Sequence, residues 1–363
     1  MKNAFVCCTP FHVIVTLQLI NTLFKDEKND IFISNHFASA EKVFRNLKKE
    51  SKNISNIANV FFVKDKEISY DKSFLKHKKI RSFAFDKPEN FIGEQLTLDY
   101  DSLNLFTHSF FTNLLVNHSF KKNKKLSINF VEEGRMSYVI SSHETKNRIK
   151  NIINKVISPF GFRIFNISLG SKLFLFQPSL YVGDFNGGIV KIPSINKNSE
   201  IKGLINKIFD YIPQPDFGKT KFIFFDQSFS IDGNEQLNEY KVIEDLIKNF
   251  NINDLLIKLH PRDSINKYEK FKLSNVNNSN YPWELIYLNE NLHGKTLISI
   301  NSSAVFTPRI IFGINHDIVL LKRMYGFIDD PLDQFLIAFN HNFKQTKVLQ
   351  PESFKNIDNL MPK

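Results

Sequence analysis

Two adjacent glutamates and a glycine, Glu132, Glu133 and Gly134, directly follow an apolar run at residues 126–131. Neighbouring carboxylates at the end of a strand point in different directions, so one can face a ligand while backbone donors or Arg135 anchor the other. Like-charge proximity and partial burial raise the pKa of one such carboxyl group, which suits a general base near neutral pH. Gly134 permits a tight turn and close approach of a ligand. An exposed acidic turn is the alternative interpretation.

A histidine, His260, follows the apolar run at residues 255–259, and Pro261 comes next. A histidine at the end of a buried strand can be protonated and can donate to a leaving phosphate. Pro261 restricts the backbone of His260, while Lys258 and Arg262 add positive charge nearby. His260 is therefore a candidate acid, and a histidine that only caps the strand end is the alternative.

Two serines, Ser302 and Ser303, follow a third apolar run at residues 297–300. Backbone N–H groups at the start of a helix, together with two hydroxyls, can hold a phosphate, although serine is also a usual N-cap residue. Glu284, in the stretch Pro-Trp-Glu-Leu at residues 282–285, can accept hydrogen bonds from ribose hydroxyls. A surface acid that starts a helix explains Glu284 almost as well.

The amino-terminal apolar run, residues 3–8, ends at Thr9 and Pro10, and His12 follows closely. Ligands of open parallel sheets bind beyond the carboxyl ends of the strands, so these three residues are candidates for the acceptor side of a site. A His12 that caps its own helix is the alternative.

Strand and helix patterns alternate around these clusters. In the first half we predict strands at residues 3–8, 31–34, 59–63 and 126–131 and a helix at 11–24. In the second half we predict strands at residues 221–225, 254–259 and 297–300 and helices at 235–250 and 304–312. Such alternation indicates parallel sheets covered on both faces, that is, an α/β chain of two doubly wound domains facing a central cleft.

The domain junction is expected in a stretch rich in Pro, Asn, Lys and Gly, residues 187–218. We therefore predict one domain over residues 1–190, which carries the Glu-Glu-Gly cluster, and a second over 215–363, whose end forms closing helices.

Composition excludes several classes of protein. The chain has 363 residues, of which 42% are hydrophobic and 23% charged, so global disorder, collagen and coiled coil fit poorly. Its two cysteines, Cys7 and Cys8, cannot form a disulfide framework or a structural zinc site alone, which favours a cytoplasmic location. We find no signal peptide and no apolar run long enough to span a membrane, so any membrane contact is expected to be peripheral.

The order of the clusters carries more information than any one of them. Glu-Glu-Gly in the first half, followed by His-Pro, Pro-x-Glu and Ser-Ser in the second, resembles the bacterial sialyltransferases of lipooligosaccharide and capsule synthesis. These include family 52 glycosyltransferases and bacterial polysialyltransferases, and the opening at residues 5–12, Phe-Val-Cys-Cys-Thr-Pro-Phe-His, is similar to family 52 openings. The resemblance spans roughly residues 3–310.

The resemblance implies a GT-B fold of two Rossmann-like domains, with CMP-sialic acid as donor substrate, a glycan acceptor, inversion at the anomeric carbon, and no cofactor or obligatory metal. Carried over by motif, Glu133 is the base that deprotonates the acceptor hydroxyl, supported by Glu132 and Gly134. The acceptor is a terminal galactoside or a sialylated glycan end, and its sugar and linkage stay open.

On the donor side, the resemblance implies that His260, beside Pro261, assists departure of CMP. Ser302 and Ser303 hold the phosphate, and Glu284 binds the ribose. From spacing alone we add Lys258, two residues before His260 on the same strand face, as a further phosphate contact.

This chain departs from the pattern of some family 52 members at one point, which leaves the identity of the base open. Some family 52 members carry it on a loop after the first strand of the second domain, where this chain has Asp226. Because the chain also has the Glu-Glu-Gly cluster, we favour Glu133 and keep Asp226 as the alternative base.

The net charge of +11 attracts anions but does not identify them. Two groups of lysines fit a solvated face or contact with the acidic inner face of the cell membrane: Lys76, Lys78 and Lys79, and Lys121, Lys122, Lys124 and Lys125. Competing hypotheses are a GT-B transferase that uses another CMP-nonulosonic acid or CDP-glycerol, and a basic module that binds nucleic acid or acidic lipid. We expect no nucleic-acid partner, because no nucleic-acid signature is present, and a homodimer stays open.

Overall fold

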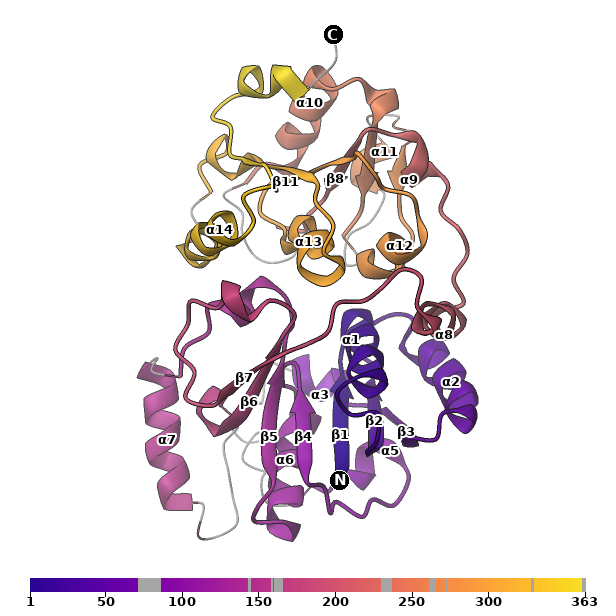
Figure 1. Ribbon diagram of the computed structural model, residues 1–363, viewed down its shortest axis with the longest axis vertical. Coiled ribbons are helices and arrows are strands. Elements are labelled where there is room, and N and C mark those ends of the chain that lie inside the picture. Colours follow the sequence, from indigo (N-terminus) through magenta and orange to yellow (C-terminus); the bar gives the residue numbers. More distant parts are fainter. Residues whose placement is uncertain are drawn as a thin grey trace. The chain divides into compact units, whose positions relative to one another are not determined.

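The computed structural model describes residues 1–70, 86–142, 145–157, 159, 166–229, 237–260, 266–269, 271, 273, 275–327 and 330–360. The chain divides into two compact units, Met1–Tyr211 and Ile212–Lys363 (Figure 1). The boundary between them falls inside the stretch 187–218, in which strand β7 (Gly188–Lys191) and helix α8 (Glu200–Phe209) belong to the first unit.

The first unit contains a seven-stranded parallel sheet in the order β3-β2-β1-β4-β5-β6-β7. Besides β7, its strands are β1 (Lys2–Cys7), β2 (Lys28–Ser34), β3 (Ile57–Val63), β4 (Ser102–Leu105), β5 (Ser127–Val131) and β6 (Gly170–Leu175). The four strands expected from the sequence correspond to β1, β2, β3 and β5. The expectation missed β4, β6 and β7.

Strand β4 was missed because its sequence, Ser-Leu-Asn-Leu, places polar residues inside the sheet. Ser102 donates its hydroxyl proton to Asn3 Oδ1 on β1 (2.8 Å), and Asn129 Nδ2 on β5 donates to Asn104 Oδ1 (2.9 Å). Asn3 Nδ2 in turn donates to Asn29 Oδ1 on β2 (3.1 Å). This polar ladder fixes the register of four neighbouring strands, because a shift of one residue would leave its buried amides unpaired.

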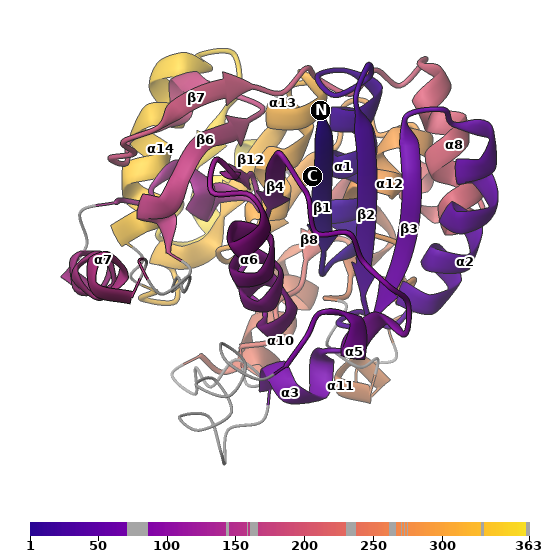
Figure 2. The same ribbon diagram turned by 90° about the horizontal axis from the view of Figure 1, so that it is seen from below.

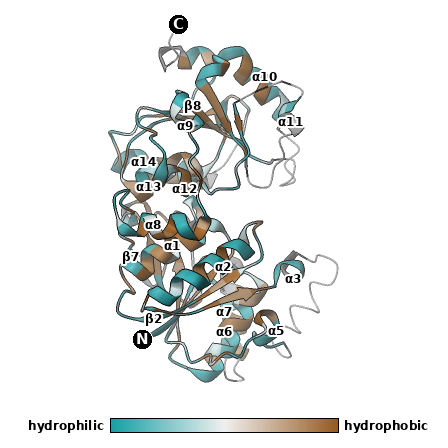
Figure 3. Ribbon diagram, turned by 90° about the vertical axis from the view of Figure 1, so that its right-hand side faces the viewer, coloured by the Kyte–Doolittle hydropathy of each residue, from teal (hydrophilic) through white to brown (hydrophobic). Residues whose placement is uncertain are grey.

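Helices cover both faces of this sheet. Helices α1 (Pro10–Asn21), α2 (Ala40–Glu50) and α8 cover one face, and α5 (Glu89–Ile92) and α6 (Phe110–Lys122) cover the other (Figure 2). The first unit also contains α3 (Lys66–Tyr70), α7 (Thr145–Ile157) and the 3-10 helices η1 (Ser51–Asn53), η2 (Arg135–Tyr138), η4 (Ile167–Leu169) and η5 (Pro178–Leu180). Helix α1 is apolar on nearly all sides, as Figure 3 shows, because it lies between the sheet and α8.

Helix α1 starts one residue earlier than predicted, at Pro10, and ends three residues earlier, at Asn21. Thr9 is the N-cap residue, and its Oγ1 accepts a hydrogen bond from the His12 N–H (3.2 Å). Pro10 fits the first helical position, where no N–H is needed. The capping residue is therefore Thr9 rather than His12.

The second unit contains a six-stranded parallel sheet in the order β10-β9-β8-β11-β12-β13. Its strands are β8 (Phe222–Phe225), β9 (Leu255–Lys258), β10 (Val276–Asn277), β11 (Thr296–Ser299), β12 (Asp317–Leu320) and β13 (Val348–Leu349). Its helices are α9 (Asp216–Lys219), α10 (Glu239–Asn249), α11 (Asn266–Glu269), α12 (Trp283–Asn289), α13 (Thr307–Phe312) and α14 (Asp330–Asn342), with the 3-10 helices η6 (Ile252–Asp254), η7 (Ser303–Phe306), η8 (Leu321–Arg323) and η9 (Phe354–Leu360).

Successive side chains of β8 point to opposite faces of this sheet. Phe224 belongs to the core formed with α10, whereas the ring of its neighbour Phe225 lies 4.6 Å from that of Trp283 on α12. The sequence correctly predicted β8, β9 and β11. The predicted helix at residues 304–312 is divided into η7 and α13.

The strand order reverses between β1 and β4 in one unit and between β8 and β11 in the other. In such sheets the carboxyl ends of the strands beside the reversal form the ligand-binding edge. The predicted alternation and parallel pairing are confirmed. Within the described ranges, none of the helices has both the length and the apolar character that crossing a membrane requires.

Candidate functional site

The two glutamates at the end of β5 differ in environment. Glu132 is buried, and its Oε2 accepts hydrogen bonds from the Tyr138 hydroxyl (2.6 Å) and the Phe176 N–H (2.8 Å). Burial raises the pKa of Glu132 to about 7, against the opposing effect of these two donors. Tyr138 belongs to η2 and Phe176 follows β6. The hydrogen bonds of Glu132 therefore link the end of β5 to η2 and to the end of β6.

Glu133 faces the other way, with a side chain that is 45% exposed. Its backbone N–H donates to Ser137 Oγ (2.8 Å), so the main chain is held while the carboxylate stays accessible. Gly134 has a φ of 128°, a region that disfavours every residue with a Cβ atom. In the Glu-Glu-Gly cluster, one glutamate anchors, the next projects, and the glycine permits the turn between them.

His12 lies beside Glu133. Its Nδ1 accepts a hydrogen bond from the Cys8 N–H (3.1 Å), and its ring stacks on Phe106 at 4.3 Å between centroids. In a neutral imidazole the proton is then on Nε2, which lies 3.6 Å from Glu133 Oε1. Burial lowers the pKa of His12, opposed by its contacts with Glu133.

The Nε2 atom of His12 is fully buried and has no hydrogen-bond partner, because 3.6 Å exceeds hydrogen-bond length. A buried N–H without a partner costs free energy unless a small movement or a ligand satisfies it. His12 therefore presents a donor toward the Glu133 carboxylate.

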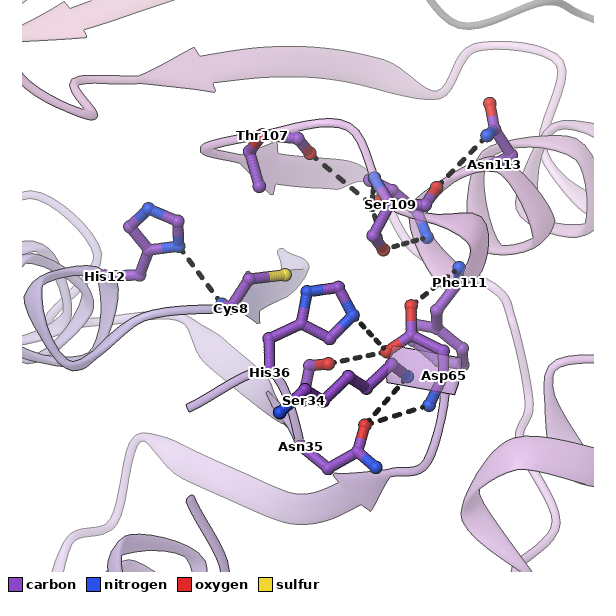
Figure 4. Close-up of polar contacts among 12 residues, drawn as sticks. Cys8, His12, Ser34, Asn35, His36, Asp65, Thr107, Ser109, Phe111 and Asn113 are labelled. Atoms are coloured by element: carbon purple, nitrogen blue, oxygen red, sulfur yellow. Dashed lines mark hydrogen bonds and ion pairs between the residues drawn. The ribbon is translucent and has the colours of Figure 1, made fainter. Parts of the chain in front are cut away.

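A second polar cluster, centred on Asp65, lies nearby (Figure 4). The Asp65 carboxylate is fully buried and accepts hydrogen bonds from the Ser34 hydroxyl (2.5 Å) and the Phe111 N–H of α6 (3.2 Å). His36 Nε2 lies 3.2 Å from Asp65 Oδ1, within ion-pair distance. Burial alone would raise the pKa of Asp65, but His36, Ser34 and the Phe111 N–H outweigh it, so the pKa lies below its ordinary value.

Sequence reasoning missed this cluster, although a signal was present. Ser34 ends a predicted strand and His36 follows it, while Asp65 comes two residues after another predicted strand. His36 is close enough to contribute to the lowered pKa of His12, and Asp65 and Glu133 both raise the pKa of Cys8, which burial raises most. The ends of β1, β2, β3 and β5 therefore bring His12, His36, Asp65 and Glu133 together.

In the second unit, Gln227 links the strands on either side of the reversal. Its Oε1 accepts hydrogen bonds from the Ser299 hydroxyl (3.1 Å) and the Asn301 N–H (2.7 Å). The preceding Asp226 is 8% exposed, and its Oδ1 accepts from the Gln227 N–H (2.8 Å). Asp226 thus stabilises the loop that carries Gln227.

His260 follows β9, and its Nδ1 lies 3.2 Å from the hydroxyl of Ser228, a buried residue in the loop after β8. If Ser228 donates, the neutral imidazole carries its proton on Nε2, the nitrogen available for a leaving group. Pro261 lies outside the described residues.

Lys258, the last residue of β9, is buried, and its Nζ donates to the Ser279 carbonyl (2.8 Å). Burial lowers the pKa of Lys258 to about 8, opposed by Glu284, and burial raises the pKa of Glu284 to about 7. The charges of Lys258 and Glu284 thus favour each other, while burial disfavours both. The phosphate and ribose contacts expected of them stay predictions.

The serines after β11 lie at the start of η7. Ser302 is the N-cap residue, and its Oγ accepts a hydrogen bond from the Ala304 N–H (3.2 Å). The Ser302 N–H donates to Ser299 Oγ (2.8 Å), while Ser303 is partly exposed. Capping therefore already uses the Ser302 oxygen, and a phosphate contact by either serine stays a prediction.

The predicted residues gather at two sheet edges. Thr9, Pro10, His12 and Glu133 lie at the carboxyl edge of the first unit, and Asp226, His260, Ser302 and Ser303 lie at that of the second. In the part of the chain that the structure describes, no group of three His, Cys, Asp or Glu side chains has an arrangement that could hold a metal ion.

Comparison with known proteins identifies the family of this chain. A family model described as alpha-2,8-polysialyltransferase (POLYST) matches residues 3–320. The chain belongs to the alpha-2,8-polysialyltransferase family. The resemblance to bacterial sialyltransferases inferred from the motifs is thereby confirmed. No curated protein sequence matches the chain closely enough to count as a relative.

Solved structures support the fold. An alpha/beta-galactoside alpha-2,3-sialyltransferase from Photobacterium phosphoreum aligns with a TM-score of 0.53 at 15% identity, covering 96% of this chain and 98% of that one. Arabidopsis thaliana UGT89C1, solved with UDP, aligns with a TM-score of 0.53 at 8% identity, covering 99% and 89%. These likenesses confirm the expected GT-B fold of two parallel-sheet α/β domains.

The Glu132→Gln substitution tests the anchor of the Glu-Glu-Gly turn. The folded-state pKa of about 7 lies above the ordinary value of 4.5, so the folded state binds this proton more tightly than the unfolded chain. Stability is therefore lost as pH rises through about 7. Glutamine keeps an acceptor for Tyr138 and Phe176 without the charge. We therefore expect the free energy of unfolding of the variant, minus that of the wild type, to increase when the pH is raised from 5 to 8. The expected increase is on the order of 1 to 3 kcal/mol.

Urea unfolding at the two pH values measures this difference. Glu284→Gln is the matched comparison in the second unit. The raised pKa of Glu284 makes the free energy of unfolding depend on pH in the same direction. A constant difference between Glu132→Gln and wild type at both pH values would contradict a protonated buried carboxyl group.

Proposed function

We propose that the protein is an inverting sialyltransferase that moves sialic acid from CMP-sialic acid to a sialylated glycan end of a bacterial lipooligosaccharide or capsule. The single observation that carries this proposal is the family match over residues 3–320, which includes the Glu-Glu-Gly, His-Pro, Pro-x-Glu and Ser-Ser stretches. The family description favours a sialylated acceptor. A terminal galactoside is the second candidate, because the Photobacterium enzyme is a galactoside sialyltransferase.

Glu133 is the proposed base. Its carboxylate is accessible at the carboxyl edge of the sheet, while its backbone is held by Ser137 and its neighbour Glu132 is locked in the core. A fixed main chain with a free carboxylate suits a group that must meet an incoming hydroxyl. His12, behind it, offers its Nε2 proton to one carboxylate oxygen and leaves the other for the acceptor.

His260 is the proposed acid for the leaving group. Ser228 orients its ring, and a proton or hydrogen bond from Nε2 offsets the charge that develops on the departing phosphate. Ser302 and the more accessible Ser303 hydroxyl are proposed to contact the same phosphate, and Glu284 the ribose. Lys258, at the carboxyl end of β9, is proposed to contribute its charge to the same phosphate.

The proposed reaction is one displacement. The acceptor oxygen bonds to the anomeric carbon as the bond from that carbon to the CMP phosphate breaks. Glu133 takes the hydroxyl proton, and His260 stabilises the phosphate. A single in-line step inverts the anomeric centre, and each general acid or base of this kind contributes about 10²- to 10⁴-fold. We expect no obligatory metal, because His260 can act as the electrophile.

Substitution of each candidate base tests whether Glu133 or Asp226 takes the proton. Glu133→Gln is expected to lower kcat by about 10²- to 10⁴-fold, because the amide cannot take a proton, with little change in KM for the donor. Asp226→Asn is expected to lower kcat by less than about tenfold, since Asp226 is buried in its own loop. CMP release, with and without EDTA, measures the rates.

His260→Ala in the same assay reports on the leaving-group side, where a loss of similar size is expected. A large loss in Asp226→Asn with normal turnover in Glu133→Gln would transfer the role of base to Asp226. Normal turnover in both Glu133→Gln and His260→Ala would refute the mechanism.

Two substitutions of His12 separate its two nitrogens. His12→Asn keeps an acceptor near the Nδ1 position for the Cys8 N–H but removes the donor toward Glu133. His12→Gln keeps a donor near the Nε2 position. We expect kcat to fall about tenfold more in His12→Asn than in His12→Gln, with thermal unfolding as the check on folding. Combining His12→Asn with Glu133→Gln should lower kcat no further than Glu133→Gln alone, whereas additive losses would contradict a role through Glu133.

Nucleotide binding tests the donor class. CMP at a hundredfold excess over its Kd is expected to stabilise the folded protein by about 2.7 kcal/mol, whereas UDP and GDP should not. The shift in Tm measures the effect. A response to CMP without sialyl transfer would favour another CMP-nonulosonic acid or CDP-glycerol as donor. Salt-sensitive binding of an oligonucleotide with no response to CMP would instead support the nucleic-acid module.

A further inference from the structure

Helix α7, Thr145–Ile157, packs with its polar side inward. Asn154 is 6% exposed, whereas Ile149, Ile152, Ile153 and Val156 are 53%, 65%, 39% and 65% exposed. A surface helix normally directs its apolar stripe toward the core. The four aliphatic side chains of α7 instead form an apolar stripe on the surface.

Basic positions border this stripe on both sides. Because each residue turns the helix by about 100°, positions 149, 152, 153 and 156 fall within an arc of about 100°. The backbone register places positions 146 and 150 along one border and 148 and 155 along the other, all of them Lys or Arg. The helix contains no Asp or Glu.

Helix α7 lies at the periphery of the first unit. It packs on η4, and in Figures 1 and 2 it stands beside the sheet rather than over the middle of either face. An apolar stripe bordered by Lys and Arg on a peripheral helix is the pattern of helices that lie in the plane of a membrane surface.

We propose that α7 docks the protein on an anionic lipid surface, with the stripe in the headgroup–acyl boundary and the bordering cations among lipid phosphates. Apolar burial and attraction to anionic headgroups then act together. Because only four aliphatic side chains insert, the association is reversible. The proposal does not depend on the donor or on the acceptor.

A second copy of the chain fits this surface less well. Stable protein–protein interfaces use about 20 to 30 residues on each side, and four aliphatic side chains fall far short of that. A symmetric contact through α7 would also bring its basic borders near those of its copy. An anionic bilayer complements the same charges.

The lysines that the sequence suggested as membrane contacts are different residues. Lys121, Lys122, Lys124 and Lys125 are exposed at and after the end of α6, and Lys76, Lys78 and Lys79 lie outside the described residues. None of these lysines belongs to α7, so the two sources of membrane attraction can be tested separately.

Vesicle co-sedimentation of the full-length protein tests the proposal. Vesicles of phosphatidylethanolamine with phosphatidylglycerol are expected to bind the wild type, and phosphatidylcholine vesicles to bind it about tenfold less. Ile152→Ser with Val156→Ser should lower binding to the anionic vesicles at least about tenfold. Lys150→Glu with Lys155→Glu should do the same, and raised salt should weaken wild-type binding.

Ile337→Ser is the matched control, because Ile337 is a 73% exposed aliphatic residue on α14 in the other unit. It should leave vesicle binding unchanged, and each variant should keep the Tm of the wild type. Failure of the wild type to bind anionic vesicles, or equal loss in Ile337→Ser, would overturn the proposal. A double variant Ile152→Ser with Val156→Ser that still binds vesicles but changes its oligomeric state in sedimentation would also overturn it.

Discussion

The buried carboxyl group of Glu132 is the constraint on which the first unit's site depends. A carboxyl group in the core is costly unless donors surround it, and here the donors come from η2 and from the residue after β6. This satisfies Glu132 and also ties the turn after β5 to the neighbouring strand. Glu133 is then held with its backbone in place and its side chain outward, and the positive φ of Gly134 lets the chain leave without covering it. Position and exposure of the projecting carboxylate both follow from the burial of its neighbour.

The same logic operates at the other strand ends of both units. Polar side chains gather at the carboxyl edge because parallel strands end together there, and several of the buried ones are hydrogen-bonded to a neighbouring strand or helix. Asp65 collects donors from β2 and α6, and Gln227 bridges from the end of β8 to the end of β11. These hydrogen bonds hold the strand ends of the carboxyl edge in place, so that an exposed side chain there acts from a fixed position. The buried Nε2 of His12 faces Glu133 without reaching it, and such an unsatisfied donor is expected where a ligand or a small closure completes the site.

Sequence reasoning succeeded where apolar runs end in chemistry-bearing residues, because both signals are local. It predicted β1, β2, β3, β5, β8, β9 and β11, and it singled out Glu133 and His12. It could not see β4, whose Ser102 and Asn104 become buried only through partners on other strands. Nor could it decide which glutamate anchors, since that depends on Tyr138 and on Phe176, far along the chain. The Asp65 cluster was within reach, because His36 and Asp65 follow predicted strands as closely as His12 does.

Helix α7 shows a limit that no local pattern can overcome. An amphipathic period predicts that a helix has an apolar side, but it does not say whether that side meets protein or solvent. The sequence of α7 would suit a helix packed on a core through its isoleucines. Burial of Asn154, with Ile152 and Val156 largely exposed, reverses that assignment. A helix oriented this way loses the hydrophobic stabilisation that its stripe would supply inside the protein. The lost stabilisation is recovered only if something apolar covers the stripe, and basic residues on both of its borders favour an anionic lipid surface over another protein.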